Sequence, residues 1–308
     1  MNTIGDRLRL TTFGESHGVA IGGVLDGFPS RFKVDFGRVA EELRARAPQR
    51  EGETMRREPD EIEWLSGLMD GVTLGTPIAF IVRNTCHRSS DYEELRHIYR
   101  PSHADLAYEQ RYGIRDYRGG GRASGRETVA RVIAGALALQ WLETQGVTIG
   151  TIVDVREDVP PGDSVGGKVR CMIKGVRAGL GNPVFGKVHS ALASAVMSIP
   201  ACHGFEYGSG LDEYGSAYND QMCMRDGKIE YLSNNSGGVL GGITTGQDIC
   251  FTAVFKPTPS ISLPQQTVSD SGDNVTLTIK GRHDRSVVRR ASVVVRAMAA
   301  LTIMDYYL

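Results

Sequence analysis

Residues 115–143 read RDYRGGGRASGRETVARVIAGALALQWLE, a basic glycine-rich segment that runs directly into a strongly apolar one. The apolar part, 126–143, predicts a helix, because Ser124 or Gly125 can cap its start and Gly146 follows its end. Apolar residues surround this helix on almost every side, so we expect it to be buried at the centre of the protein.

The rest of the chain supplies shorter elements of both kinds. Further helices are predicted at 38–46, 187–199 and 291–307, and strands at 19–25, 77–82, 147–155, 167–173, 249–255 and 274–280. Strands and helices do not alternate regularly, which favours an α+β fold over a doubly wound sheet. Glycine-rich loops come from both halves, so we expect one integrated domain over residues 1–308. The polar stretch 48–60 is expected to be an exposed loop.

Composition excludes several classes of protein. The chain has 308 residues, 41% hydrophobic and 23% charged, with a formal net charge of −1. This balance excludes a disordered tail, a fibre and a small disulfide scaffold, and it gives no overall basic field for nucleic acid or a membrane. No segment approaches the ~20 apolar residues that span a bilayer, and no signal sequence is recognisable. Five scattered cysteines without CxxC spacing fit reduced thiols in the cytoplasm.

Arginine is unusually common among the basic residues. Of 35 Lys and Arg residues only seven are Lys. A GC-rich genome would explain this bias, and so would a site that grips phosphate or carboxylate groups with bidentate hydrogen bonds. Residues 115–126 place four arginines around Gly119–Gly121 at the start of the predicted helix, where glycine N–H groups and the helix dipole also favour anions. The segment is neither a GxGxxG nor a Walker A loop, and it predicts a phosphate site.

Two histidines and three later loops could complete such a site. His17 lies between glycines in GESHG (14–18), where it can face a ligand and exchange protons near neutral pH, or simply stabilise the turn. His103 follows Ser102, a possible helix cap, in RPSHAD (100–105). The C-terminal half adds SNNSGGVLGG (233–242), KPTPS (256–260) and GRHD (281–284), which together suggest a further anion-binding patch and a carboxylate, Asp284, beside basic residues.

These motifs, in this order, resemble the chorismate synthase family, and RREPDEIEWLSG (56–67) adds to the match. Local departures are Ala123 and Gly125, where the family usually shows Ser and Ala, and Arg285, where Pro is usual. The stretch 151–170 is shorter than is usual in the family. The resemblance implies a β-α-β sandwich, with long central helices between antiparallel sheets, assembled as a homotetramer.

The resemblance also implies an activity. Members eliminate phosphate from 5-enolpyruvylshikimate 3-phosphate in a 1,4-anti sense to give chorismate, using reduced FMN without net redox change, and NADPH is a possible reductant. An external flavin reductase is expected as a partner, because the segments of a built-in reductase are missing. The substrate and FMN together carry two phosphates and two carboxylates, which accounts for the arginines better than genome bias does.

The site residues carried over fall into three groups. The catalytic group is Ser16, His17, His103, Ser124 and Asp284. The FMN contacts are Arg122, Ala123, Ser124, Pro200, Ala201, Gly241, Lys256, Pro257, Thr258, Pro259, Ser260 and Arg282, with Arg46 and Arg50 linked to NADPH. The substrate contacts are Arg46, Arg115 and Arg126. We expect His17 to act on the departing phosphate, His103 to lie near flavin N1, and Asp284 to relay a proton.

Two other functions use the same residues. A nucleic-acid-binding module would place the arginines on backbone phosphates, but the net charge of −1 argues against it. A histidine-based phosphatase would use His17 and His103 beside the anion site, and would release phosphate from simple esters without a flavin. A metal site is the weaker choice, since no second histidine stands at metal-ligand spacing from His17.

Overall fold

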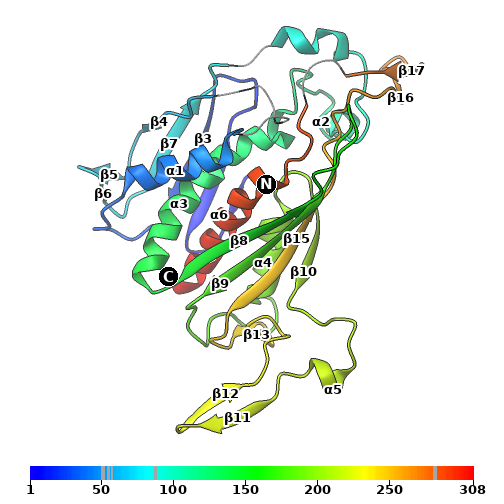
Figure 1. Ribbon diagram of the computed structural model, residues 1–308. Helices are drawn as coiled ribbons and strands as arrows, with labels where there is room; N and C mark the ends of the chain where they lie inside the picture. The colour runs from blue at the N-terminus through cyan, green and yellow to red at the C-terminus, as the bar shows by residue number, and fades with distance from the viewer. Residues whose placement is uncertain (50–52, 54–55, 57, 87–88, 280–282) are drawn as a thin grey trace.

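Two antiparallel sheets enclose a layer of helices (Figure 1). The computed structural model describes residues 1–49, 53, 56, 58–86, 89–279 and 283–308. The first sheet has the order β1-β2-β3-β7-β4 and the second the order β10-β15-β9-β8. The strands of the first are β1 (Thr3–Ile4), β2 (Arg9–Phe13), β3 (Ala20–Asp26), β7 (Ile78–Arg83) and β4 (Ile62–Trp64); those of the second are β10 (Cys202–Tyr207), β15 (Ile249–Phe255), β9 (Gly167–Lys174) and β8 (Thr148–Val155).

The central layer is built from α3 (Thr128–Thr144) and α6 (Val288–Tyr307), with α1 (Phe36–Arg46) and α4 (Val188–Met197) beside them. Helix α3 packs on β2 and β3, α6 packs on β8 and β9, and the two helices pack on each other. Their backbones approach so closely that a Cβ on Gly135 would lie 2.4 Å from Cβ of Ala297. Only glycine fits at this crossing.

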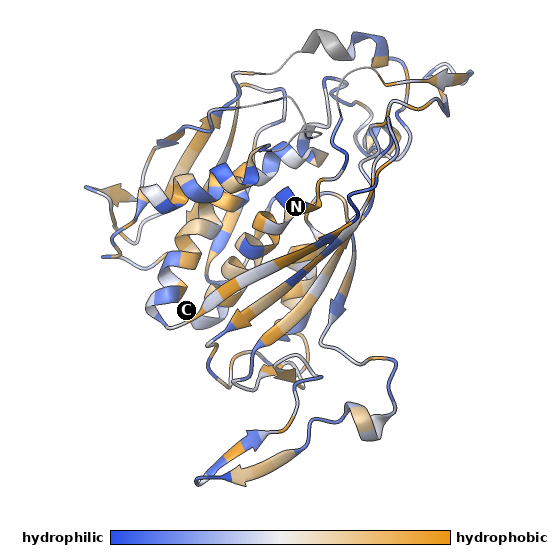
Figure 2. Ribbon diagram, viewed as in Figure 1, coloured by the Kyte–Doolittle hydropathy of each residue, from blue (hydrophilic) through white to orange (hydrophobic). Residues whose placement is uncertain are grey.

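Side-chain alternation in the strands agrees with burial between the layers. In β15 every second residue from Ile249 to Phe255 is buried, and Ile21 of β3 pairs with Val82 of β7 in the other sheet. Helix α3 is buried along nearly its whole length, which is why its sequence lacks a polar face. Figure 2 shows this apolar interior in the helices and in the facing strands.

A long arm extends away from the body between β10 and β13 (Figure 1). It carries α5 (Gly215–Tyr218) and the hairpin of β11 (Met222–Arg225) and β12 (Lys228–Tyr231). Apolar side chains on this arm, including Leu211, Met222, Met224, Ile229 and Leu232, are exposed. The remaining elements are β5 (Leu68–Met69), β6 (Val72–Thr73), η1 (Ser89–Leu95), α2 (Asp105–Tyr112), η2 (Gly121–Ala123), η3 (Gly125–Glu127), β13 (Val239–Leu240), β14 (Ile243–Thr244), β16 (Gln265–Val268) and β17 (Asn274–Leu277).

The α+β fold predicted from the sequence is confirmed, and each predicted helix is present within three residues of its expected ends. The predicted strand at 274–280 ends earlier, at Leu277. The expectation of an exposed loop at 48–60 is wrong at its end, because Asp60 is buried. Among the described residues, no helix is long and apolar enough to cross a membrane.

Candidate active site

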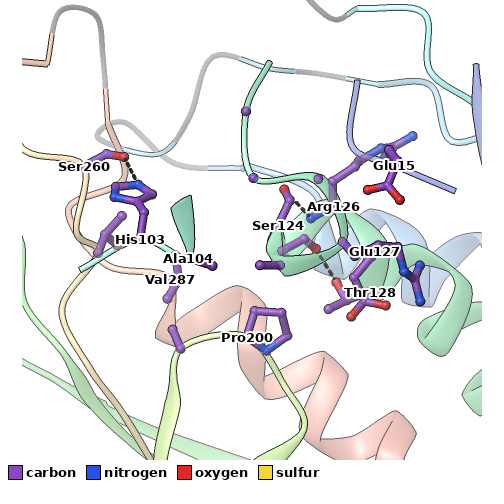
Figure 3. Close-up of a pocket in the computed structure, with 18 of the residues that line it drawn as sticks. Glu15, His103, Ala104, Ser124, Arg126, Glu127, Thr128, Pro200, Ser260 and Val287 are labelled. Carbon is purple, nitrogen blue, oxygen red and sulfur yellow. Dashed lines mark hydrogen bonds between the residues drawn. The ribbon is translucent and has the colours of Figure 1, made fainter. Parts of the chain in front are cut away.

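A cavity of about 1800 Å³ lies where α3 and α6 begin. The segment before α3, the turn after β2 and the 256–260 segment contribute to its wall. Most of the residues predicted for the site line it: His17, Arg46, His103, Arg115, Arg122, Ala123, Ser124, Arg126, Pro200, Ala201, Lys256, Thr258, Pro259, Ser260 and Asp284. Figure 3 shows His103 and Ser260 on one side of this space and Ser124 and Arg126 on the other.

The segment before α3 folds into two short 3-10 turns, η2 and η3. Ser124 caps η3, where its Oγ accepts a hydrogen bond from the backbone N–H of Arg126 at 3.2 Å. A Cβ on Gly119 would lie 2.5 Å from the His17 ring, and the φ of this glycine is +89°. The glycine run therefore lets the backbone pass directly against the histidine, as a close approach to a ligand also requires.

His17 is buried at the end of the turn that follows β2. Its Nδ1 lies 3.0 Å from Oγ of Ser16, and Tyr92 meets the ring edge-on at 5.0 Å. Ser16 is buried behind the histidine and is not itself part of the cavity wall. The serine and the tyrosine hold the imidazole ring in place.

His103 bridges two distant parts of the chain. Its Nε2 lies 3.0 Å from Oγ of Ser260, and its Nδ1 lies 3.0 Å from the carbonyl oxygen of Pro101. Burial, followed by the nearby Arg100 guanidinium, lowers the pKa of His103 to about 4. The expected cap at Ser102 is wrong, because Ser102 has a left-handed φ of 57° and α2 begins at Asp105 without a side-chain cap.

Two of the predicted substrate arginines share one carboxylate. Arg46 Nη2 donates to Oδ2 of Asp60 at 2.7 Å, and Arg126 Nη1 donates to Oδ1 of the same residue. The side chains of Arg46, Asp60 and Arg126 are 8%, 6% and 6% exposed. Burial lowers the pKa of Arg46, and Asp60 opposes that shift.

The other arginines of the basic segment already have partners within the protein. Arg115 donates to the carbonyl groups of Leu95, Arg96 and Ile98, and it lies near Asp105 and Glu109. Arg122 donates to Oγ1 of Thr12 at 2.6 Å, and the exposed Arg118 pairs with Asp116. Each of the four arginines donates to a carboxylate or a carbonyl oxygen of its own, which offsets the repulsion that a bare cluster would have. Arg115 and Arg122 therefore stabilise loops as well as lining the cavity.

The C-terminal half contributes the opposite wall. Lys256 Nζ donates to the carbonyl oxygen of Ser102 at 2.8 Å, and Asp284 pairs with Arg290 of α6. Among the described residues, this pair joins the loop before α6 to the first turn of that helix.

The short connection between β8 and β9 fastens this wall. Ser164 Oγ donates a hydrogen bond to the carbonyl oxygen of Thr258 at 2.6 Å. The backbone N–H of Val165 donates to the carbonyl oxygen of Arg285 at 2.8 Å. These bonds hold the 256–260 segment and the loop before α6 to the same connection. The position of both lining segments thus depends on a stretch that joins two strands of the second sheet.

Some predicted residues are not brought to the cavity. Gly241 lies in the turn between β13 and β14 and does not line it, nor does Pro257. The SNNSGGVLGG loop packs instead against the neighbouring backbone, where Gly237 meets Gly208. Arg50 and Arg282 lie outside the described residues.

Sequence reasoning missed the acidic and amide residues that hold the arginines. Asp60 and Asn84 are both buried, and Asn84 Oδ1 accepts from Arg126 Nε at 3.1 Å. Glu58 accepts hydrogen bonds from Arg56 and from the backbone N–H of Thr85. Burial by itself raises the pKa of Glu58, but these hydrogen bonds lower it to about 2. A usable signal was that so many arginines beside one helix start require carboxylates from elsewhere, and REPD at 57–60 places two acidic residues just before β4.

The cavity has unmet hydrogen-bonding capacity that suits anions. Arg46 Nε, Arg115 Nη1 and Arg126 Nη2 are buried and make no hydrogen bond to described residues. Buried N–H groups of a charged side chain are costly unless a ligand accepts from them. Among the described residues, no group of His, Cys, Asp and Glu is arranged to hold a metal ion. Phosphate and carboxylate groups are the ligands that this arrangement would accept.

Comparison with known proteins identifies the family. The chorismate synthase family model matches residues 8–160 and 153–308. The chorismate synthase of Phocaeicola vulgatus is 46% identical over 349 aligned positions, which cover 100% of this chain and 98% of that protein. That of Porphyromonas gingivalis is 46% identical over 352 positions, covering 100% and 96%.

The relatives also differ from this chain in length. The chain supplies 308 residues to the 349 aligned positions, and the two matched segments meet at 153–160, inside the stretch expected to be short. A crystal structure of a chorismate synthase has a TM-score of 0.75 to this chain at 28% identity, covering 98% of this chain and 92% of that one. On sequence and on structure alike, the chain belongs to the chorismate synthase family.

Proposed function

We propose that the cavity eliminates the 3-phosphate and a C6 hydrogen from 5-enolpyruvylshikimate 3-phosphate to give chorismate. Membership of the family makes the chain a lyase of aromatic amino-acid biosynthesis. The observation that carries the proposal is the set of buried arginine N–H groups that make no hydrogen bond to described residues, in a cavity that His17, His103 and Asp284 also line. A substrate with one phosphate and two carboxylates matches those donors in charge and in bidentate geometry.

The residues present fit a reduced flavin beside the substrate. Family membership implies a requirement for a reduced flavin, and we propose that it is FMN, with NADPH as a possible reductant and an external flavin reductase as its source. The cavity of about 1800 Å³ exceeds the ~300–1000 Å³ that one small ligand fills. Arg122–Ser124, Pro200–Ala201 and Lys256–Ser260 would hold the flavin. When bound, it would supply electron density to the breaking C–O bond.

The protein's own side chains would divide the remaining work. Arg46 and Arg126 would bind the substrate anions, and His17 would stabilise and protonate the departing phosphate. His103 would hold the Ser260 segment against the flavin, near its N1. Asp284, beside Arg290, would serve as the relay for the proton that leaves C6. Ser16 and Ser124 would orient His17 and the segment before α3.

We further propose that the chain works as one domain within a cytoplasmic homotetramer. A single cluster of buried apolar residues extends over both sheets and the helices between them. The arm with β11 and β12 exposes Met222, Met224 and Ile229, more apolar surface than an isolated hairpin normally leaves in water. Contact with a second copy would cover it, and sedimentation of the purified protein would measure the number of copies.

An anaerobic assay of chorismate formation tests the activity directly. Reduced FMN should support many turnovers without being consumed, and oxidised FMN should support none. Loss of one reduced flavin for each chorismate would contradict the proposal and indicate an ordinary oxidoreductase. Release of phosphate from simple esters without flavin would indicate a hydrolase instead.

A further inference from the structure

A single buried carboxylate holds two arginines of the cavity in one arrangement. Asp60 offers one oxygen to Arg46 and the other to Arg126, so neither guanidinium can turn without breaking a bond to the same residue. Asp60 also has a left-handed backbone, with a φ of 51°, which presents its short side chain between the two arginines. Asp60 lies in the segment 56–67, which supported the resemblance, but it was not among the residues predicted for the site.

The plane of Arg126 is fixed from a second direction. Asn84 Oδ1 accepts from Arg126 Nε at 3.1 Å, while Asn84 Nδ2 donates to the carbonyl oxygens of Glu15 and Gly18 at 3.0 and 2.8 Å. The arginine is thereby connected to the turn that carries His17. With Nη1 and Nε engaged, Nη2 is the nitrogen that makes no hydrogen bond to described residues.

The electrostatic balance of the group favours an anion. Two guanidinium groups share one carboxylate, so the three side chains together carry one positive charge in a buried position. Arg126 and Arg290 both act to lower the pKa of Arg46, in the same direction as its burial. Removing the carboxylate would leave two like charges to repel each other, and at least one guanidinium would move.

We propose that Asp60 is a positioning residue, which sets the spacing and orientation of Arg46 and Arg126 so that both meet the anionic groups of the substrate. Asp60 lines the cavity wall, and in this role it acts through the two arginines rather than on the reacting atoms. This inference rests on the proposed function, because the proposed function identifies the substrate as the anion that the two arginines bind.

The test is Asp60→Asn, which keeps the shape of the side chain and tolerates a left-handed backbone. Asp70→Asn is the matched control, because Asp70 also has a left-handed φ, of 50°, but is exposed and does not line the cavity. We expect the KM of Asp60→Asn for 5-enolpyruvylshikimate 3-phosphate to rise ~10-fold or more while kcat falls less than ~3-fold. The control should match the unsubstituted protein.

Titration calorimetry gives a readout that does not depend on turnover. Asp60→Asn should weaken binding of the substrate, without flavin, by ~10-fold or more, about 1.4 kcal/mol. In a double variant with Arg126→Lys, Asp60→Asn should weaken substrate binding less than ~3-fold beyond the loss caused by Arg126→Lys alone. The reason is that both substitutions disrupt the same arrangement of side chains. Unchanged affinity in Asp60→Asn, or fully additive losses, would overturn the inference.

A second set of variants leaves Asp60 in place, in case Asp60→Asn does not fold. Arg46→Lys, Arg126→Lys and the double variant should show coupled losses of affinity, since one carboxylate orients both side chains. Independent losses would overturn the inference. If the unsubstituted protein neither binds nor converts the substrate with reduced FMN, the proposed function itself fails, whereas normal conversion with an inert Asp60 rejects the positioning role alone.

Discussion

The imidazole of His103 accepts a hydrogen bond from Ser260, a residue 157 positions further along the chain. The direction follows from the other ring nitrogen. The carbonyl oxygen of Pro101 can only accept, so Nδ1 of His103 carries the proton, and Nε2 of the neutral ring is left to accept from the Ser260 hydroxyl. His103 thus joins the segment before α2 to the 256–260 segment on one side of the cavity, and both of its nitrogens are engaged.

This pairing predicts a pH dependence of stability. The pKa of His103 is about 4 in the folded protein and ~6.5 in an unfolded chain, so between these values the unfolded state binds more protons. The free energy of unfolding should therefore fall as pH decreases from about 6.5 to about 4, with His103 contributing at most ~1.4 kcal/mol per pH unit.

Urea unfolding across this pH range would measure the effect. His103→Gln should flatten the dependence, while His97→Gln, a change at an exposed histidine paired with Asp270, should leave it in place. An identical slope in the His103 variant and the unsubstituted protein would show that another group is responsible.

His17→Ala should lower kcat by ~10²-fold or more, the usual loss for a general acid, with little change in FMN affinity. The physical reason is that the imidazole is held by Ser16 and Tyr92 against the glycine run, where the departing phosphate is expected. Steady-state kinetics and flavin titration would separate the two quantities. Near-normal turnover would return His17 to the role of a turn residue.

Arg126→Lys keeps the charge but removes the planar fork, so the KM for substrate should rise clearly. Arg118→Lys is the control, because Arg118 also pairs with an aspartate but is exposed and lies outside the cavity wall. Full activity with an unchanged KM in the Arg126 variant would mean that this guanidinium only stabilises the fold.

Asp284→Asn keeps the shape of the residue and removes its basicity. We expect FMN and substrate still to bind, kcat to fall by ~10-fold or more, and the deuterium isotope effect at C6 to grow, because proton removal becomes slower relative to C–O cleavage. Asp158→Asn, a change in an exposed aspartate–arginine pair, is the control. Weakened FMN binding with intact turnover of the loaded enzyme would instead make Asp284 a scaffold for the loop that Arg290 holds.

The sequence revealed the fold where periodicity was strong. Helix α3 was predictable because its residues are apolar on all sides, and β15 because its side chains alternate. The arm with β11 and β12 was not predicted, since its short, largely exposed strands carry no such pattern. Local turn chemistry also failed at Ser102, where a left-handed backbone replaces the expected cap.

Many residues that line the cavity were predictable from the sequence, whereas the residues that hold them in position were not. Glycine runs, histidines and arginines can be recognised as candidate site residues from their type and spacing. Asp60 and Asn84 are ordinary polar residues in the sequence, and their importance comes from their burial in the folded protein. Burial at such positions depends on tertiary contacts between segments far apart in the chain, as between Asp60 and Arg126. Gly241 shows the converse, a residue of a recognisable motif that the fold leaves away from the cavity.

The glycine at the crossing of α3 and α6 has a consequence for the site. Both helices begin at the cavity, with Thr128 at one start and Arg290 near the other, and they touch backbone to backbone at Gly135 and Ala297. This contact sets the distance between the two helices, so a methyl group inserted there would push the two helix starts apart. The spacing of the two helix starts is therefore set partly in the apolar core, about 4.5 Å along α6 from Val294, the nearest lining residue of that helix, by the 1.5 Å rise per helical residue.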